Sequence, residues 1–136
     1  AALGLNQMKR LDQYVKRRHQ IAEYYDSELK SLSLKTPFQL PETYSSYHLY
    51  PICIKNRKIK KTQKQIYNEI RNNNVLVNIL YIPVHRQPYY ENLGFKKNDF
   101  PVAENFYQEV ICIPMYPTLQ DKHQEYVIET IRKVMI

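Results

Sequence analysis

Apolar residues recur with a helical period over the first 29 residues of the chain. In the stretch AALGLNQMKRLDQYVKRRHQIAEYYDSEL they follow one another at intervals of three, four or seven positions, which places them on one face of a helix. These residues are Met8, Leu11, Val15, Ala22, Tyr25 and Leu29. The pattern predicts one long helix that is already formed at its first residues, so we expect the chain to be a piece of a longer protein.

Three short runs rich in apolar and aromatic residues predict β-strands. They are YHLYPICI at residues 47–54, VLVNILYI at residues 75–82 and VICIP at residues 110–114. A polar, proline-bearing connection precedes the first run, and a basic turn, KNRKIKK at residues 55–61, follows it.

Local capping signals predict a helix between the first two strands. Thr62 and Gln65 form a T-x-x-Q capping box, so the helix is expected from about Gln63 to Asn73. The asparagines at 72–74 end it, because Asn tolerates the left-handed backbone conformation at a helix C-terminus. Its inward side chains are predicted to be Ile66, Tyr67 and Ile70.

Two further helices are predicted in the second half of the chain. PVAENFYQE, residues 101–109, begins with a proline suited to a first helical turn. DKHQEYVIETIRKVMI, residues 121–136, follows a cap formed by Thr118 and Asp121. Its inward residues are predicted to be Tyr126 or Val127, Ile131 and Val134.

The order of elements, α-β-α-β-α-β-α, predicts an α/β fold with two layers, a short sheet and its helices. A length of 136 residues fits one domain, residues 1–136. The long first helix extends beyond what such a small layer needs, so its remainder is expected to face a partner.

Composition limits the cellular setting. Cys53 and Cys112 both lie inside apolar runs, which favours buried free thiols in a reducing compartment over a disulfide or a metal pair. No apolar run approaches the roughly 18 residues that span a membrane, and the start lacks the pattern of a signal peptide. We expect a soluble, cytoplasmic protein with no membrane partner.

Several common kinds of site are excluded by residue counts and spacing. With only Gly4 and Gly94, a glycine-rich phosphate loop is impossible. The four histidines form no metal-binding spacing, so no metal is expected. The cysteines sit in apolar strands and no serine has the setting of a nucleophile.

The basic balance suggests an alternative class. The net charge is +7 and the pI about 9.3, and basic runs occur at residues 9–19 and 55–61. A stand-alone basic module that binds nucleic acid or an acidic protein is therefore the alternative. However, 13 acids are interleaved with the basic residues and the 13 tyrosines fall at core-like spacings, so we expect no nucleic-acid partner.

The segment YIPVHRQPYY, residues 81–90, carries the densest group of candidate binding residues. Its two prolines exclude a central strand or a helix interior and predict an ordered loop. A lone histidine after a proline is more often a surface or hydrogen-bonded loop residue than a functional one, and the crowded polar and aromatic loop around His85 strengthens the functional interpretation. His48, at the start of a strand, carries less of this signal.

Taken in order, several segments resemble the sugar aminotransferases of the DegT/DnrJ/EryC1/StrS family. They are AALG, YHLYPI, YIPVHRQPYY, DFPVAENFYQE and ICIPMYPTLQDKHQEYVIE. The resemblance covers essentially the whole chain and is closest to the transaminases of pseudaminic acid biosynthesis. It implies the C-terminal small domain of a fold-type I enzyme dependent on pyridoxal phosphate (PLP), with a mainly antiparallel sheet and residues 1–30 as the helix linking two domains.

The same resemblance implies that the catalytic large domain lies upstream. The family's cofactor-binding lysine and phosphate-binding groups belong to that domain, and none of the 13 lysines here stands in a matching motif. We therefore expect no catalytic or cofactor-binding residue in this chain and no activity from it alone. The complete protein is expected to be a homodimer that uses PLP, glutamate and a UDP-linked 4-keto-deoxy sugar, for surface glycan or flagellin glycosylation.

The resemblance also implies a substrate-binding role for the second predicted strand and the loop after it. Tyr81 and His85 are the expected contacts to the sugar nucleotide, since both offer a flat face and a polar tip. The neighbouring positions are Asn78, Ile79 and Leu80 along the same side, Arg86 toward a diphosphate, and His48 nearby. The chain departs from the family at Asn74-Val75, where relatives carry Gly-Ile, and at Leu80, where they often carry histidine.

Overall fold

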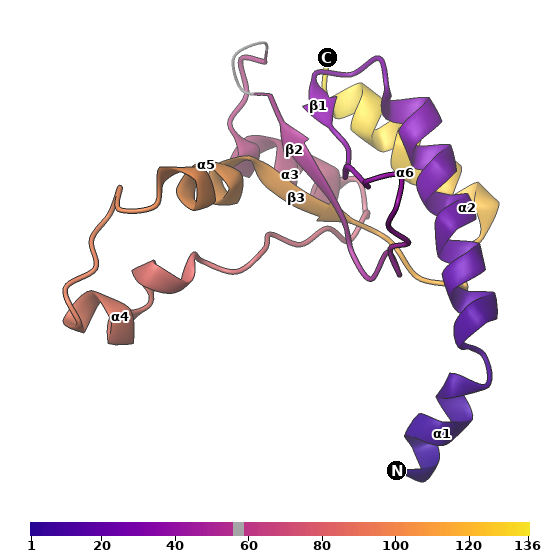
Figure 1. Cartoon of the computed structure of the whole chain (residues 1–136). Helices are drawn as coiled ribbons and strands as arrows, with labels where there is room; N and C mark the ends of the chain where they lie inside the picture. The colour runs from indigo at the N-terminus through magenta and orange to yellow at the C-terminus, as the bar shows by residue number, and fades with distance from the viewer. Residues whose placement is uncertain (56–58) are drawn as a thin grey trace.

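The computed structural model describes residues 1–55 and 59–136, so the middle of the predicted basic turn lies outside the described residues. The elements run in the following order (Figure 1): α1 (Ala2–Met8), α2 (Leu11–Leu29), β1 (Leu34–Lys35), β2 (Tyr50–Ile54), α3 (Gln63–Asn72), η1 (Val84–Arg86), α4 (Pro88–Asn92), α5 (Pro101–Glu109), β3 (Val110–Ile113) and α6 (Asp121–Val134). None of the helices in these ranges is both long and apolar enough to span a bilayer.

The sheet is antiparallel, with strand order β1-β2-β3. Tyr50 lies opposite Ile113, and Leu34 lies opposite Ile54. The predicted α/β class with a short antiparallel sheet is therefore confirmed. The predicted first strand begins three residues later than expected, because Tyr47 has a positive φ of 43° that interrupts the extended run.

One of the three predicted strands was wrong. Residues 75–82 form no strand, and only Asn78 pairs with the sheet, through an isolated bridge to Cys112. The strand at the opposite edge is β1, whose two residues are too few to carry an alternating pattern. Within 75–78 the side chains still alternate, with Val75 and Val77 buried and Leu76 and Asn78 exposed.

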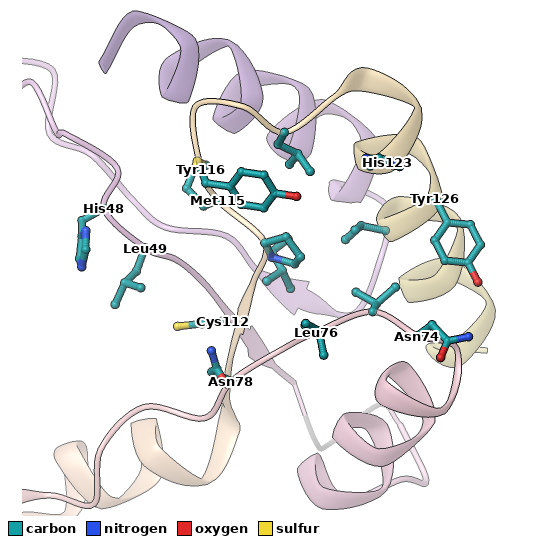
Figure 2. Close-up of a pocket in the computed structure, with 15 residues that line it drawn as sticks. His48, Leu49, Asn74, Leu76, Asn78, Cys112, Met115, Tyr116, His123 and Tyr126 are labelled. Atoms are coloured by element: carbon teal, nitrogen blue, oxygen red, sulfur yellow. The ribbon is translucent and has the colours of Figure 1, made fainter. Parts of the chain in front are cut away.

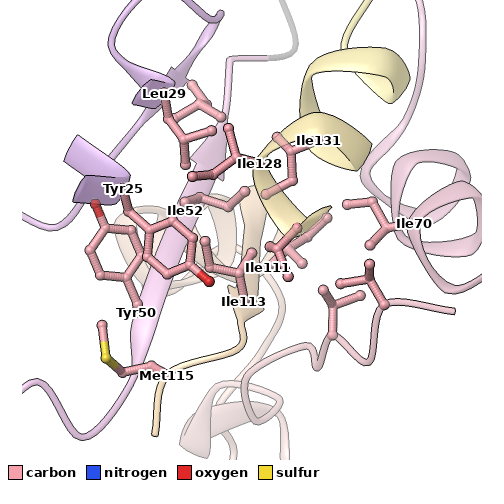
Figure 3. Close-up of a cluster of buried hydrophobic side chains, with 14 of the residues drawn as sticks. Tyr25, Leu29, Tyr50, Ile52, Ile70, Ile111, Ile113, Met115, Ile128 and Ile131 are labelled. Atoms are coloured by element: carbon pink, nitrogen blue, oxygen red, sulfur yellow. The ribbon is translucent and has the colours of Figure 1, made fainter. Parts of the chain in front are cut away.

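The hydrophobic core lies between the sheet and the helices α2, α3 and α6. Figure 3 shows side chains from these elements meeting: Tyr25, Leu29, Ile52, Ile70, Ile111, Ile128 and Ile131. Two buried tyrosines keep their hydroxyl groups hydrogen-bonded, Tyr25 to the Pro114 carbonyl at 2.9 Å and Tyr50 to the Asp26 carboxylate at 2.6 Å. These bonds let large aromatic side chains fill the core without an unpaired polar atom.

The predicted first helix is interrupted at Lys9 and Arg10. Every residue of α1 is exposed, and so is Leu11, whereas Tyr25 and Leu29 at the other end of α2 are buried. Burial therefore begins only in the second half of the predicted helix. Figure 1 shows α1 extending beyond the end of α2, away from the sheet.

The local signals for α3 were read correctly. The Thr62 hydroxyl oxygen accepts a hydrogen bond from the Gln65 amide, and the Gln65 side-chain oxygen accepts one from the Thr62 amide. Asn74 has a φ of 58°, the left-handed conformation expected after the helix. The prediction for α6 was wrong in its cap, because Gln120 and not Thr118 is the N-cap.

Residues 79–100, called the arm below, project from the sheet on the side opposite α2 and α6 (Figure 1). The predicted loop contains two short helices, η1 and α4, that its prolines did not suggest. Pro88 occupies the first turn of α4, where the missing N–H is not needed. The arm therefore has local structure of its own, and it returns to the sheet through α5, which passes directly into β3.

Candidate functional site

The predicted substrate-binding residues begin where the chain leaves the sheet. The Asn78 amide donates to the Cys112 carbonyl at 3.1 Å, and the Cys112 amide donates to the Asn78 carbonyl at 2.7 Å. This exchange fixes the backbone at Asn78 while its side chain stays exposed. The residues after Asn78 therefore leave the edge of the sheet in a defined direction.

Residues 79–82 present their side chains mainly to solvent. Tyr81 is 92% exposed, Ile79 and Ile82 are exposed, and Leu80 is half-buried. A tyrosine with almost its entire ring free can stack on a sugar or a base and donate from its hydroxyl. Among the predicted contacts, Tyr81 has the most freely accessible side chain.

His85 lies in a different environment from Tyr81. It is 6% exposed, and its Nε2 atom is 2.9 Å from Oε1 of Glu104, which is itself 7% exposed. The His85 hydrogen bond, with the Asn98 amide and the nearby charge of Arg86, holds the pKa of Glu104 below its ordinary value. His85 is thus the hydrogen-bonded loop residue that the sequence allowed, and its role as a direct substrate contact stays a prediction.

Arg86 is paired within the arm. Its Nε atom donates to Oε1 of Glu91 at 2.7 Å, and the guanidinium is half-buried. A phosphate would have to compete with or join this carboxylate, so contact between Arg86 and a diphosphate remains a prediction.

A groove of about 470 Å³ lies beside Asn78. Figure 2 shows His48 and Leu49 on the opposite side of this groove from Asn74 and Tyr126. Its apolar lining includes Cys112 and Ile113 from β3 and Val127 from α6. The groove brings Asn78 and His48 together, whereas Tyr81, His85 and Arg86 lie further along the arm.

Sequence reasoning missed several polar residues at this groove and in the arm. Tyr116, His123 and Tyr126 line the groove from the segment after β3 and from α6. Glu104 was also missed. It stands three residues before Tyr107, so the two side chains share one face of the helix at 101–109. An acidic residue on the inward face of a helix needs a polar partner, and this signal could have identified Glu104.

Both cysteines are free thiols, and burial raises the pKa of Cys112 to about 11, which disfavours the nucleophilic thiolate. Within residues 1–55 and 59–136, no group of three or more His, Cys, Asp or Glu side chains is arranged to hold a metal ion. The described residues offer aromatic, amide and imidazole groups suited to binding.

The family model of the DegT/DnrJ/EryC1/StrS aminotransferases matches residues 1–132. The chain belongs to this family. A curated relative, the spore coat polysaccharide biosynthesis protein SpsC of Bacillus subtilis, is 36% identical over 99% of this chain and 36% of its own length.

Solved structures of similar aminotransferases share the fold of this chain. Spr1654 of Streptococcus pneumoniae in its PMP form is 29% identical, with a TM-score of 0.88 over 98% of this chain and 33% of that one. Helicobacter pylori PseC, an aminotransferase involved in pseudaminic acid biosynthesis, is 26% identical, with a TM-score of 0.87 over 98% of this chain and 36% of that one. The chain thus spans about a third of the length of the relatives it matches.

Proposed function

We propose that this chain is the C-terminal domain of a PLP-dependent transaminase that moves an amino group from glutamate to C4 of a UDP-linked keto-deoxy sugar. The observation that carries the proposal is the family match over residues 1–132, together with the likeness to an enzyme of pseudaminic acid biosynthesis. The product would serve surface glycan synthesis or flagellin glycosylation, in keeping with a relative named for polysaccharide biosynthesis.

The described residues do not by themselves fit a PLP site. A cofactor-binding lysine needs a buried position that lowers its pKa, and every lysine in the described ranges is exposed or half-buried. Lys61, the half-buried one, is engaged with Glu69 at 2.8 Å and with the Val134 carbonyl at 2.9 Å. We therefore propose that a large domain preceding Ala1 binds PLP, that residues 1–30 connect it to this domain, and that the chain alone is inactive.

The contribution proposed for this chain is one side of the substrate site. Tyr81 would contact the sugar nucleotide, and Asn78, Ile79 and Leu80 would line the same side. The exposure of Tyr81 and the anchoring of Asn78 on β3 support this assignment. The complete protein is proposed to act as a homodimer.

The side-chain pairing of basic residues disfavours the alternative of a nucleic-acid or acidic-protein module. Arg17 donates to Asp121 at 2.6 Å, Arg18 donates to the Tyr47 carbonyl at 2.6 Å, and Arg132 is paired with Glu28 at 2.5 Å. These side chains connect α2 to other parts of the fold. A guanidinium engaged in this way has fewer donors left for phosphates.

The test uses the complete protein with glutamate, PLP and a UDP-linked 4-keto-6-deoxy sugar. Mass spectrometry should detect the 4-amino sugar nucleotide together with an equal amount of 2-oxoglutarate, and the isolated 136-residue chain should form neither. Product formation by the isolated chain would refute its proposed inactivity. Failure of the complete protein to aminate any nucleotide-linked keto sugar would refute the proposed function.

A further inference from the structure

Glu104 of α5 joins two parts of the arm at one carboxylate oxygen. Oε1 lies 2.9 Å from Nε2 of His85 in η1 and 2.6 Å from the amide of Asn98, which donates to it. Asn98 has a φ of 76°, so the backbone turns there in a conformation that an L-residue rarely adopts. The loop before α5 and the end of the 79–85 segment therefore converge on a single side chain of α5.

The pair is shielded by aromatic rings. The ring centroids of Phe100 and His85 are 4.9 Å apart, and those of Phe95 and Phe100 are 6.1 Å apart. With Tyr90 they line an open, apolar pocket of about 380 Å³ next to His85. Because His85 and Glu104 are each less than a tenth exposed, leaving either side chain without its hydrogen-bond partner is costly.

The 79–82 segment is thus held at both ends by neighbouring elements. Asn78 is bonded to Cys112 of β3, and His85 is bonded to Glu104 of α5. Because α5 passes directly into β3, the two anchors belong to one continuous stretch of chain. The segment between them, which carries the exposed Tyr81, has its position fixed by these two contacts.

We propose that Glu104 is a positioning residue for substrate binding, which fixes the 79–82 segment and Tyr81 by holding His85. The inference rests on the proposed function and deepens it. Glu104 touches no reacting atom in this role. It keeps His85 in one orientation, as a carboxylate does when it accepts from an imidazole N–H, and so pre-orders the binding surface.

The experiment compares Glu104→Ala with wild type in the complete protein. Hydrogen exchange of the Arg86 and Gln87 amides, which close η1 by bonding to Pro83 and Val84, should become about tenfold faster or more, whereas amides of α6 should not change. The KM for the UDP-linked keto sugar should rise about fivefold or more, with kcat and the KM for glutamate within about twofold of wild type.

Two conservative variants and one control define the role. In Glu104→Gln the amide oxygen can accept from both His85 and Asn98, so exchange and KM should stay within about threefold of wild type. Glu104→Asp keeps the charge but shortens the side chain, and it should show an intermediate effect; it supplies the test if the alanine variant does not fold. Glu109→Ala, on the same helix, should change neither measurement.

The outcomes separate the two proposals. Unchanged exchange in both Glu104→Ala and Glu104→Asp overturns the positioning role. Faster hydrogen exchange with an unchanged KM for the sugar nucleotide also overturns the positioning role, since the contact would then be only structural. The same holds if the KM values for the sugar nucleotide and for glutamate rise equally. A complete protein that makes no amino sugar but still shows faster exchange confirms the anchoring contact and refutes the proposed function with its substrate role.

Discussion

Asn78 exchanges two backbone hydrogen bonds with Cys112, at 3.1 and 2.7 Å, and this is the point where the candidate substrate-binding segment meets the sheet. The bridge makes β3 the support for residues 78–82. It also explains why a run that looked like a strand behaves as a connection: the chain pairs at one position and then leaves the sheet along the arm. A short anchored segment of this kind can present side chains without being buried itself.

The first prediction concerns Tyr81. Replacing it with alanine in the complete protein should raise the KM for the sugar nucleotide about fivefold, which corresponds to losing about 1 kcal/mol of stacking and hydrogen bonding. Thermal unfolding should be unaffected, because the side chain is 92% exposed. Tyr89→Ala, an exposed tyrosine of α4 on the same arm, is the control and should leave KM unchanged. Equal effects of the two substitutions would contradict the assignment.

The second prediction concerns the core. Ile131 is fully buried between α6 and the sheet, so Ile131→Ala should lower the free energy of unfolding by about 2–5 kcal/mol, through lost burial and the cavity left behind. Urea denaturation followed by circular dichroism measures this change. Ile136→Ala removes the same atoms at a position that is 98% exposed and should have almost no effect. A loss below 1 kcal/mol for Ile131→Ala would argue against the core described.

The third prediction separates two threonines that sequence reasoning treated alike. Thr62 caps α3, so Thr62→Ala should lower the free energy of unfolding by about 1 kcal/mol. Thr118 precedes α6 but is not its N-cap, and Thr118→Ala should change stability by less than about 0.5 kcal/mol. Urea denaturation of the two variants in parallel gives the comparison, and the reverse order would show that the caps are misassigned.

The fourth prediction concerns thiol reactivity. Burial, with a smaller contribution from Cys53, raises the pKa of Cys112 from 9.0 to about 11. At pH 8 its thiolate population is therefore about a hundredfold lower than that of an ordinary thiol, and iodoacetamide should modify it slowly. The less buried Cys53 should react first, as mass spectrometry of a labelling time course would show.

The raised pKa of Cys112 also makes the stability of the folded state depend on pH. Folding favours the protonated Cys112 thiol, so its contribution is fully present below pH 9 and is lost as the pH rises toward 11. Labelling of Cys112 before Cys53 at pH 8 would contradict the burial described.

The helices and their order could be predicted from the sequence wherever local chemistry is sufficient. The capping box at Thr62 and Gln65 specifies the start of α3, and Pro101 marks the start of α5. These signals involve residues within one turn, so they do not depend on the rest of the fold. The family was recognised in the same way, from segments whose order and composition are visible without coordinates.

Strand pairing required tertiary structure. The run at 75–82 has the composition of a strand, but a strand exists only where a neighbour supplies hydrogen bonds, and here Cys112 supplies them at Asn78 alone. Leu34 and Lys35, which have no pattern of their own, become β1 because β2 lies beside them. Pairing partners distant in sequence decide such cases.

The candidate site also has one part that the sequence determines and one part that only the tertiary structure decides. By itself the sequence determined the segment: it places Tyr81 and His85 in a proline-rich stretch, and prolines are excluded from helix interiors and central strands. Only the tertiary structure decided that Tyr81 is exposed while His85 is buried against Glu104, 19 positions away. Exposure and pairing depend on which distant side chains pack nearby, and a local pattern of residues does not contain that information.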